Sequence, residues 1–349
     1  MKKRIVSIIL VFALVLSMAA CGSKNEATQN QEPNNAASET EVKFEKVTLK
    51  MSTIGTETNS DTQSARKLAK EVKEETNGQI IIEVYPQDQL SGGDMTKSIE
   101  LLAQGTTDIM ISSVGTLSSI NEKMQISVIP FLFSNYEEAS EVIEASGADY
   151  WAKLLAERGI KYVDYIHNGL RQITNSKRPI KTPADLAGLK IRVPGGSIYM
   201  DSFRALGADP VSMNWSEVFT ALQQGTIDGQ ENGFTVTNSN NLFEVQKYLT
   251  VWNYIYEANL CIVNESKWSK LKPETQEYLE KKIHESCAWG RDFVVNGEEE
   301  LKAKFIKEGM EVYELSSDEQ KAFRDALADT VAKYKEKFGE EACAAFQIK

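Results

Sequence analysis

The sequence predicts an α/β protein built from two similar lobes, and three observations lead to this prediction. Strand and helix patterns alternate along the chain, one helix-to-strand pattern recurs 120 residues further on, and one predicted helix is long enough to run along both lobes. Alternating strands and helices are typical of a mostly parallel sheet that helices cover on both faces. A length of 349 residues is consistent with two domains.

The chain begins with a segment typical of bacterial secretion. Three basic residues at 2–4 precede an apolar run at 5–16, which is shorter than the roughly 20 residues that span a membrane. Residues 18–22, MAACG, resemble a bacterial lipobox. The resemblance implies cleavage before Cys21 and a diacylglycerol on its sulfur. Ordinary cleavage, with Cys21 incidental, is the alternative.

We therefore predict a signal peptide over 1–20, and a lipidated Cys21 with a flexible tether over 21–44. The tether is polar and nearly free of large apolar side chains, so it cannot form a core. Cleavage would remove three basic residues and no acidic ones, leaving 36 basic and 50 acidic residues and a net charge of −14.

The first lobe follows the tether. Short apolar runs predict three strands, at 47–51, 80–85 and 108–112. Apolar residues at helical spacing from Ala65 to Val72 predict a helix between the first two strands, ended near Gly78. A second helix is predicted from an Asp94 cap to Gly105.

The second lobe repeats this pattern. A strand at 189–193 precedes a helix at 198–206, and Ser216 is the expected cap of a further helix that ends at Gly225. The segments LLAQGTTDI at 101–109 and ALQQGTIDG at 221–229 both predict a helix end, a glycine cap and an aspartate that enters a strand. Two lobes of similar structure explain this match.

The C-terminal part is helical in pattern. Residues 273–309 contain no proline after Pro273 and would extend about 54 Å as one continuous helix. That length exceeds a single lobe, so the helix is expected to run along both. A second helix is predicted over about 317–338.

Composition and motifs exclude several function classes. The net charge of −11, with no basic patch to offset it, argues against a nucleic-acid partner. His167 and His284 have no ligands at metal spacing, and there is no GxSxG, Walker or GxGxxG motif. Cys261, Cys287 and Cys343 are interpreted as small buried hydrophobes. We expect no enzyme activity, no cofactor and no metal.

The positive evidence points to ligand binding. Arg171 and Arg192 lie near strand edges, in NGLRQIT and GLKIRVP. In open α/β sheets such edges face the ligand crevice, and an arginine there can bind a carboxylate through two parallel hydrogen bonds. A surface arginine in a weak ion pair is the alternative for each.

Residues 47–346 resemble the solute-binding subunit of tripartite ATP-independent periplasmic (TRAP) transporters, the DctP-like family. The motifs that carry the resemblance are ETNGQIIIEVYPQDQL at 75–90, LLAQGTTDI, IPFLF at 129–133, NGLRQITNS at 168–176, GLKIRVPGG at 188–196 and SEVFTALQQGTIDGQEN at 216–232. The last segment is the most diagnostic, because it covers a helix, a cap and a strand in one run.

The resemblance implies a two-lobed periplasmic-binding-protein architecture with crossing strands and a long hinge helix. Lobe I would comprise residues 45–168 and 258–297, and lobe II residues 169–257 and 298–349. It also implies binding of an organic-acid anion between the lobes and delivery to the membrane permease subunits. The protein would then be extracytoplasmic, held by its lipid anchor at the outer face of the cell membrane.

The family's ligand contacts carry over to single positions. The resemblance implies that Arg192 pairs with the ligand carboxylate and that Arg171 is a second carboxylate partner. Asn232 would be a polar contact, and Trp215 would pack on the ligand. Contacts in the first lobe would come from Thr53, Ser113 and Glu57. Phe219 replaces the frequent tyrosine and Gly233 the usual proline, which leaves the clamp intact but changes its surroundings.

A sugar acid such as glucuronate or galacturonate is the expected ligand, with a C4-dicarboxylate as the alternative. The candidate ligand contacts in the first lobe are Thr53, Glu57 and two serines. None of them is a cation that could pair with a second carboxylate. The broad face of Trp215 suits a sugar ring. Alternatively, Trp215 fills the lobe core and Glu57 faces water. An extracellular enzyme and a ligand-sensing module are the other classes considered.

Overall fold

The computed structural model describes residues 44–348 and contains two β-sheets. The predicted signal peptide and the lipidated Cys21 lie outside the described residues. The first sheet has the order β2 (Ile80–Tyr85), β1 (Val47–Thr53), β3 (Ile109–Ser113), β10 (Tyr256–Asn264) and β4 (Ile160–Leu170). The second sheet has the order β11 (Glu311–Glu314), β9 (Tyr248–Val251), β5 (Gln172–Asn175), β8 (Gly229–Asn232), β6 (Lys190–Val193) and β7 (Asp209–Ser212).

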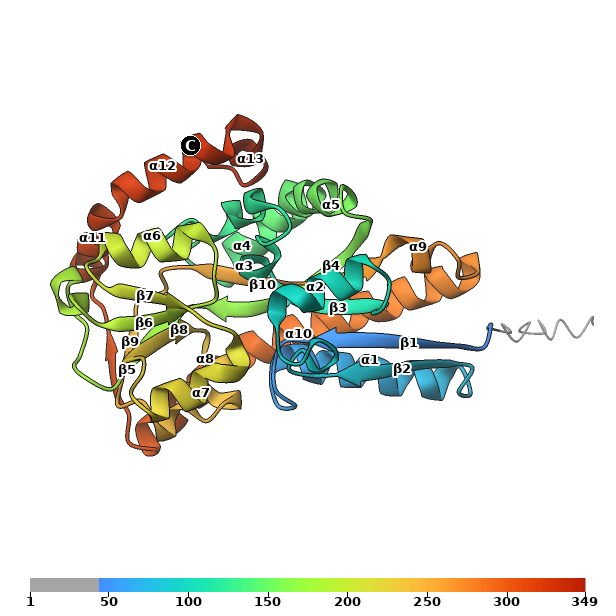
Figure 1. Ribbon diagram of the computed structural model, residues 1–349, viewed down its shortest axis with the longest axis horizontal. Coiled ribbons are helices and arrows are strands. Elements are labelled where there is room, and N and C mark those ends of the chain that lie inside the picture. The colour runs from blue at the N-terminus through green and yellow to red at the C-terminus, as the bar shows by residue number, and fades with distance from the viewer. Residues whose placement is uncertain (1–43, 349) are drawn as a thin grey trace, which may run out of the picture. The chain divides into compact units, whose positions relative to one another are not determined.

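Helices surround both sheets (Figure 1). From the first sheet's half of the chain come α1 (Ser60–Glu75), α2 (Met95–Ala103), α3 (Val114–Leu117), α4 (Tyr136–Val142) and α5 (Ala148–Ala156). The middle of the chain supplies α6 (Ser197–Ala205), α7 (Trp215–Gln223), α8 (Phe234–Ser239) and α9 (Glu265–Trp268). The C-terminal helices are α10 (Pro273–Lys307), α11 (Ser317–Ala326), α12 (Ala328–Phe338) and α13 (Glu340–Ala345). The α/β prediction is confirmed.

The sheets are mixed, and the expectation of mostly parallel sheets was wrong. In the first sheet β1 pairs in parallel with β2 and β3, but β10 runs antiparallel to both β3 and β4. In the second sheet β5 runs antiparallel to β8 and β9. The antiparallel strands are those that pass between the sheets, because a chain that crosses and returns must reverse direction.

The chain passes between the two sheets twice, and the two connections lie side by side. β4 of the first sheet ends at Leu170 and β5 of the second begins at Gln172, so Arg171 alone separates them. The chain returns from β9 to β10 over residues 252–255. The backbone N–H of Arg171 donates to the carbonyl of Ile255 at 2.8 Å, which ties one crossing to the other.

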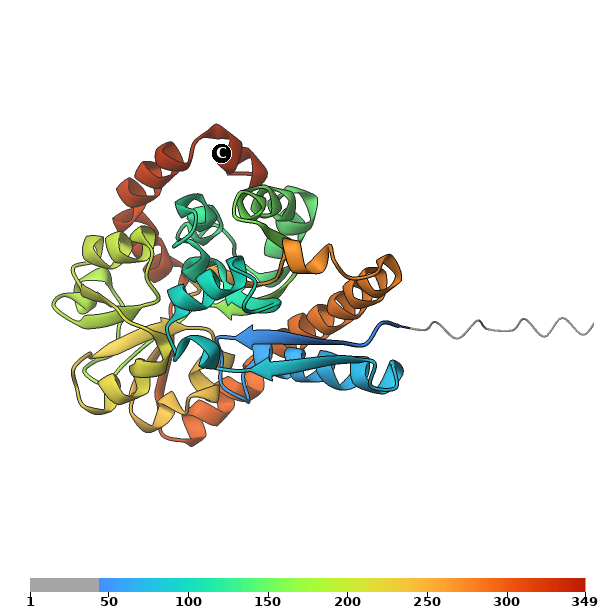
Figure 2. The same ribbon diagram turned by 45° about the vertical axis from the view of Figure 1, so that its right-hand side comes forward.

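The predicted long helix is continuous and runs along both sheets. α10 packs against α1 and β4 at one end and against α8 and β11 at the other, and Figures 1 and 2 both show it beside the two halves. Gly290 permits a close approach to α1 and β4, since a Cβ there would lie 2.4 Å from Oγ of Ser64 and 2.9 Å from Cγ2 of Ile166. The glycine that weakens the helix pattern is therefore required by packing.

The two matched segments make the same contacts in the two sheets. Asp108 accepts a hydrogen bond from the backbone N–H of Lys50 at 2.8 Å, and Asp228 accepts one from that of Lys190 at 2.9 Å. The glycine three residues before each aspartate has a positive φ, of 75° and 68°. Each segment thus ends a helix and fixes the next strand to its neighbour.

Two element boundaries differ from the prediction. Asn214, rather than Ser216, is the N-cap residue of α7, so the helix begins at Trp215. The helix expected over 317–338 is two helices, α11 and α12, separated by Leu327. The backbone of Leu327 leaves helical geometry, with φ of −101° and ψ of 0°, and this ends the first helix there.

Candidate functional site

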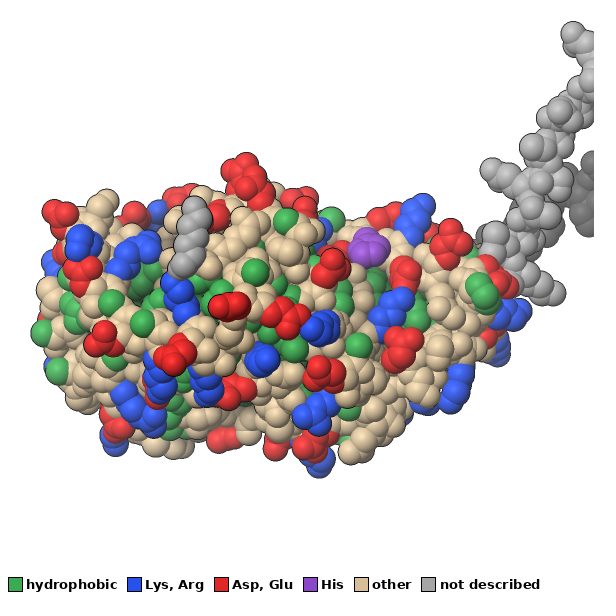
Figure 3. All heavy atoms as spheres, turned by 90° about the horizontal axis from the view of Figure 1, so that it is seen from above, with side chains coloured by type: hydrophobic (Ala, Val, Ile, Leu, Met, Phe, Trp, Pro, Cys, Tyr) green, Lys and Arg blue, Asp and Glu red, His purple; other side chains and the backbone are tan. Residues whose placement is uncertain are grey.

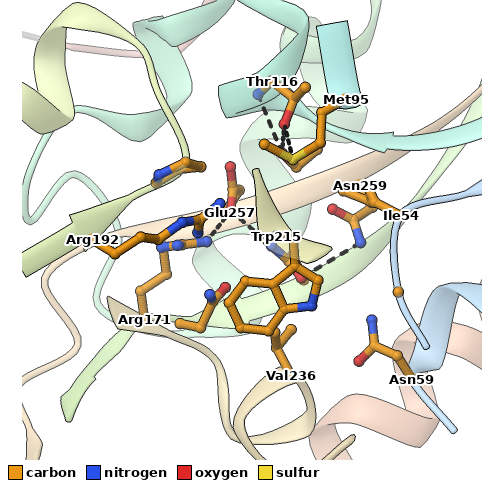
Figure 4. Close-up of a pocket in the computed structure, with 15 residues that line it drawn as sticks. Ile54, Asn59, Met95, Thr116, Arg171, Arg192, Trp215, Val236, Glu257 and Asn259 are labelled. Carbon is orange, nitrogen blue, oxygen red and sulfur yellow. Dashed lines mark hydrogen bonds and ion pairs between the residues drawn. The ribbon is translucent and has the colours of Figure 1, made fainter. Parts of the chain in front are cut away.

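One pocket collects side chains from both sheets (Figure 4). It lies where the carboxyl ends of β1 and β3 face those of β6 and β8, which is where open α/β sheets bind ligands. The lining encloses about 380 Å³ of empty space, including solvent at its mouth. The lining residues are Ile54, Gly55, Asn59, Met95, Ser113, Thr116, Asn168, Arg171, Arg192, Pro194, Trp215, Asn232, Val236, Glu257 and Asn259.

Arg171 is placed in the pocket wall by the crossing between β4 and β5, and two carboxylates neutralise it. Its Nε and Nη2 donate to the carboxylate of Glu231, the latter at 2.7 Å, and its Nη1 donates to that of Glu257. Burial alone would lower the pKa of Arg171, but Glu231 and Glu257 together raise it well above its ordinary value. Arg171 is thus held in a fixed position, and its positive charge is already paired with the two carboxylates.

Each glutamate has further donors. Glu257 accepts from the backbone N–H of Gly115 at 3.0 Å, from Nδ2 of Asn168 at 2.7 Å and from the hydroxyl of Tyr199 at 3.0 Å. Glu231 accepts from the hydroxyl of Tyr254 at 2.8 Å. Buried carboxylates are tolerated when such donors surround them, so this cluster forms a fixed floor beneath the pocket.

Arg192 differs, because no carboxylate of residues 44–348 lies within ion-pair distance of it. Its Nε and Nη2 donate to the backbone carbonyl of Met213 at 3.0 and 2.7 Å, and its guanidinium lies 5.2 Å from the ring centre of Trp215. The side chain is only 2% exposed. Burial, together with the nearby charge of Arg171, lowers the pKa of Arg192 to about 9.

Three other expected contacts also line the pocket. Trp215, the first residue of α7, packs into an apolar cluster with Val218 and Val236 and also faces the pocket, so it belongs to the core and to the site at once. Asn232, at the end of β8, donates to Gln230 at 3.0 Å. Ser113 caps α3 through a hydrogen bond from the N–H of residue 116.

Two expected residues lie away from the pocket lining. Thr53 is fully buried, and its hydroxyl bonds to that of Thr62 at 2.7 Å. Glu57 has a 60% exposed side chain and pairs with Arg66 at 2.7 Å. The hydrogen bond from Arg66 lowers the pKa of Glu57. The open alternative, that Glu57 faces water, matches this position.

Sequence reasoning missed several pocket residues. Asn168, which lines the pocket, and Glu231, which binds Arg171 beneath it, lie inside the segments NGLRQITNS and GQEN, but only their arginine and asparagine neighbours were considered. Glu257 and Asn259 are in β10, whose sequence YEANLCIVN gives no local signal. Asn59 is in the turn before α1, and only its contacts reveal it.

The arrangement suits the binding of one anion. Both glutamates are bonded to Arg171, whereas Arg192 has no carboxylate within ion-pair distance among the described residues, so its guanidinium is the group that can pair with an anion. On the face seen in Figure 3, acidic and basic side chains are interspersed. Attraction for an anion must therefore act locally, at Arg192.

The described residues show no cluster of side chains that could hold a metal ion. Cys261 and Cys287 are buried beside each other between β10 and α10. A hydrogen bond between them, together with burial, raises the pKa of Cys287 well above its ordinary value. They are packing residues, as expected. No helix in the described part of the chain is both long and apolar enough to cross a membrane.

Comparison with known proteins gives consistent matches. The model of the family described as bacterial extracellular solute-binding protein, family 7, matches residues 51–337. The chain is 32% identical over 275 residues to the 2,3-diketo-L-gulonate-binding periplasmic protein YiaO of Escherichia coli (strain K12), covering 79% of this chain and 83% of that protein. It is 30% identical over 277 residues to the C4-dicarboxylate-binding periplasmic protein DctP of Vibrio cholerae, covering 79% and 82%.

A solved structure matches both fold and sequence. A TRAP periplasmic solute-binding protein from Polaromonas, bound to D-erythronate, superposes with a TM-score of 0.81 and is 32% identical. The match covers 86% of this chain and 98% of that one.

Proposed function

The chain belongs to the bacterial extracellular solute-binding proteins of family 7, and on this premise we propose that its pocket captures a sugar acid through a carboxylate bound at Arg192. The predicted relation to the solute-binding subunits of TRAP transporters is confirmed, and the protein is a transport subunit rather than an enzyme. Glucuronate and galacturonate are the ligands proposed, and the membrane permease subunits are the partners.

The observation that carries this proposal is the buried charge of Arg192. A guanidinium that is 2% exposed and faces a pocket without a carboxylate partner is costly unless a ligand supplies the anion. Its neighbour Trp215 presents a flat apolar face beside the guanidinium. A carboxylate attached to a ring would therefore meet both groups at once.

The remainder of the lining favours a sugar acid over a C4-dicarboxylate. Among the described lining residues, Arg171 and Arg192 are the only cations, and Arg171 is already bound to two glutamates. A second carboxylate would have no cation at the far end of the pocket. The Vibrio cholerae relative is named for C4-dicarboxylates, so these ligands are the competing candidates.

Two further parts of the proposal concern assembly. The lobes, divided near residues 168 and 258, would close around the ligand by bending at the crossings and along α10, and the closed form would be recognised by the permease. Lipidation of Cys21 would hold the protein at the outer face of the membrane. Mass spectrometry of the mature N-terminus tests the anchor, and an unmodified start at another residue would contradict it.

The test of the ligand class is a thermal-shift panel of glucuronate, galacturonate, succinate and malate. A ligand at 100 times its dissociation constant should add about 2.7 kcal/mol to the free energy of unfolding. We expect the uronates to raise the melting temperature of the wild type but not of Trp215→Ala. Stabilisation by succinate or malate without a response to the uronates would contradict the sugar-acid proposal.

A further inference from the structure

Two buried carbonyl oxygens in the pocket lack hydrogen-bond donors. Asn59 and Asn259 line the pocket and are 3% and 1% exposed. Among residues 44–348, no donor reaches Oδ1 of either side chain. Buried polar atoms are nearly always paired in folded proteins, so two orphaned acceptors at one pocket indicate a ligand that supplies donors.

The orientation of Asn59 follows from a neighbouring acid. Its Nδ2 donates to Oδ1 of Asp61 at 2.7 Å. Asp61 is held in turn by the backbone N–H groups of Gly55 and Thr62, at 2.7 and 2.8 Å. Because each carboxyl oxygen of Asp61 already accepts a backbone N–H, the amide nitrogen of Asn59 faces Oδ1 of Asp61, and the carbonyl oxygen of Asn59 is left for other donors.

The orientation of Asn259 follows from the arginine cluster. Oε2 of Glu257 accepts from Nδ2 of Asn168 at 2.7 Å, which fixes the amide of Asn168. Oδ1 of Asn168 then accepts from Nδ2 of Asn259 at 3.5 Å. The carboxylate that binds Arg171 therefore also determines that Asn259 offers a carbonyl oxygen to the pocket.

The two asparagines lie apart from the arginines. Figure 4 shows Arg171 and Arg192 on one side of Trp215, and Asn59 and Asn259 on the other. The pocket thus has a cationic side and a side whose free polar atoms are hydrogen-bond acceptors.

The structure assigns Asn59 and Asn259 as specificity-determining residues that accept hydrogen bonds from hydroxyl groups of a ligand whose carboxylate is bound at Arg192. This assignment rests on the proposed function and extends it by naming the protein atoms that select hydroxyl donors. A second carboxylate would bring anionic oxygens against two carbonyl oxygens. Polyhydroxy acids are therefore favoured, and dicarboxylates without hydroxyls are disfavoured.

The test measures ligand affinity by titration calorimetry for wild type, Asn59→Ser and Asn259→Ala. Serine at position 59 keeps a good N-cap residue for α1. Asn296→Ala, which changes an exposed asparagine of α10 outside this pocket, is the matched control. The ligands are D-glucuronate, D-galacturonate, succinate and cyclohexanecarboxylate, the last being a ring with a carboxylate and no hydroxyls.

We expect Asn59→Ser and Asn259→Ala each to lower the affinity for the uronates about five- to tenfold, the effect of one lost hydrogen bond. Cyclohexanecarboxylate should bind these variants as it binds wild type, which also shows that their pockets are folded. Undiminished uronate affinity, or an equal loss for cyclohexanecarboxylate, would overturn the assignment while the proposed function stands. Wild-type protein that binds succinate but neither uronate would overturn both.

Discussion

Replacing Arg192 by methionine should stabilise the ligand-free protein while abolishing ligand binding. Methionine keeps the apolar stem and removes the buried charge. The pKa of Arg192 is lowered from its ordinary value to about 9, because burial disfavours the charged form and Arg171 repels it. At 1.36 kcal/mol per pKa unit, the charge costs the fold about 3 to 5 kcal/mol.

The size of this effect depends on pH. The folded-state pKa lies below the unfolded one, so the cost is fully present below about pH 9 and declines as the pH rises above that value. The variant loses the hydrogen bonds to the carbonyl of Met213, which offsets about 1 kcal/mol. A net gain of about 2 to 4 kcal/mol at pH 7 should raise the melting temperature by several degrees.

Arg171→Met is the matched control, since it removes the other buried arginine of the pocket. It leaves Glu231 and Glu257 without their cation, so it should lower the free energy of unfolding by about 3 to 5 kcal/mol. Thermal melting of both ligand-free variants, with calorimetric titration of the uronates, makes the comparison. A lower melting temperature for Arg192→Met than for wild type would refute the claim that the buried charge of Arg192 destabilises the protein until an anion binds.

Three other perturbations give separate tests. Arg192→Lys should weaken ligand binding by about 2 kcal/mol or more in titration calorimetry, since one ammonium group cannot bind the carboxylate in a planar, two-bond contact; near wild-type affinity would rule out that contact. Burial raises the pKa of Asp88 to about 7, so its ionisation costs stability as the pH rises from about 4 to 7. Asp88→Asn should therefore melt several degrees higher than wild type at pH 8 but not at pH 4, and equal gains at both values would exclude this cause. Gly290→Ala should lower the free energy of unfolding by about 1 kcal/mol, because overpacking against Ser64 and Ile166 exceeds the gain in helix propensity. Gly297→Ala in the same helix should be neutral or stabilising, and a stabilised Gly290→Ala would contradict the packing at Gly290.

Local patterns predicted the elements well because their causes are local. The spacing of apolar residues and the absence of internal prolines indicated α10, and the structure has it as one helix. The matched segments indicated two similar halves, and their aspartates make equivalent contacts. The direction of β10 was not predictable in this way, because its antiparallel pairing with β3 and β4 depends on how the chain returns between the sheets.

Some residues of the site could be found from local sequence, and others depend on contacts between distant segments. Arg171 and Arg192 were found because arginines stand out beside apolar strands, but the sequence did not reveal that two glutamates neutralise Arg171. Glu257 reaches Arg171 from 86 residues away. Asn259 acquires its role through a chain of hydrogen bonds that begins at Glu257. Such contacts exist only once the strands have paired.

The most direct test of ligand binding at Arg192 is a crystal structure of the protein with the uronate that stabilises it most. We expect the ligand carboxylate in hydrogen-bond contact with the guanidinium of Arg192, the sugar ring against Trp215, and ligand hydroxyls within hydrogen-bond distance of Oδ1 of Asn59 and Asn259. A carboxylate bound away from Arg192, with that guanidinium still bonded only to the carbonyl of Met213, would contradict this expectation.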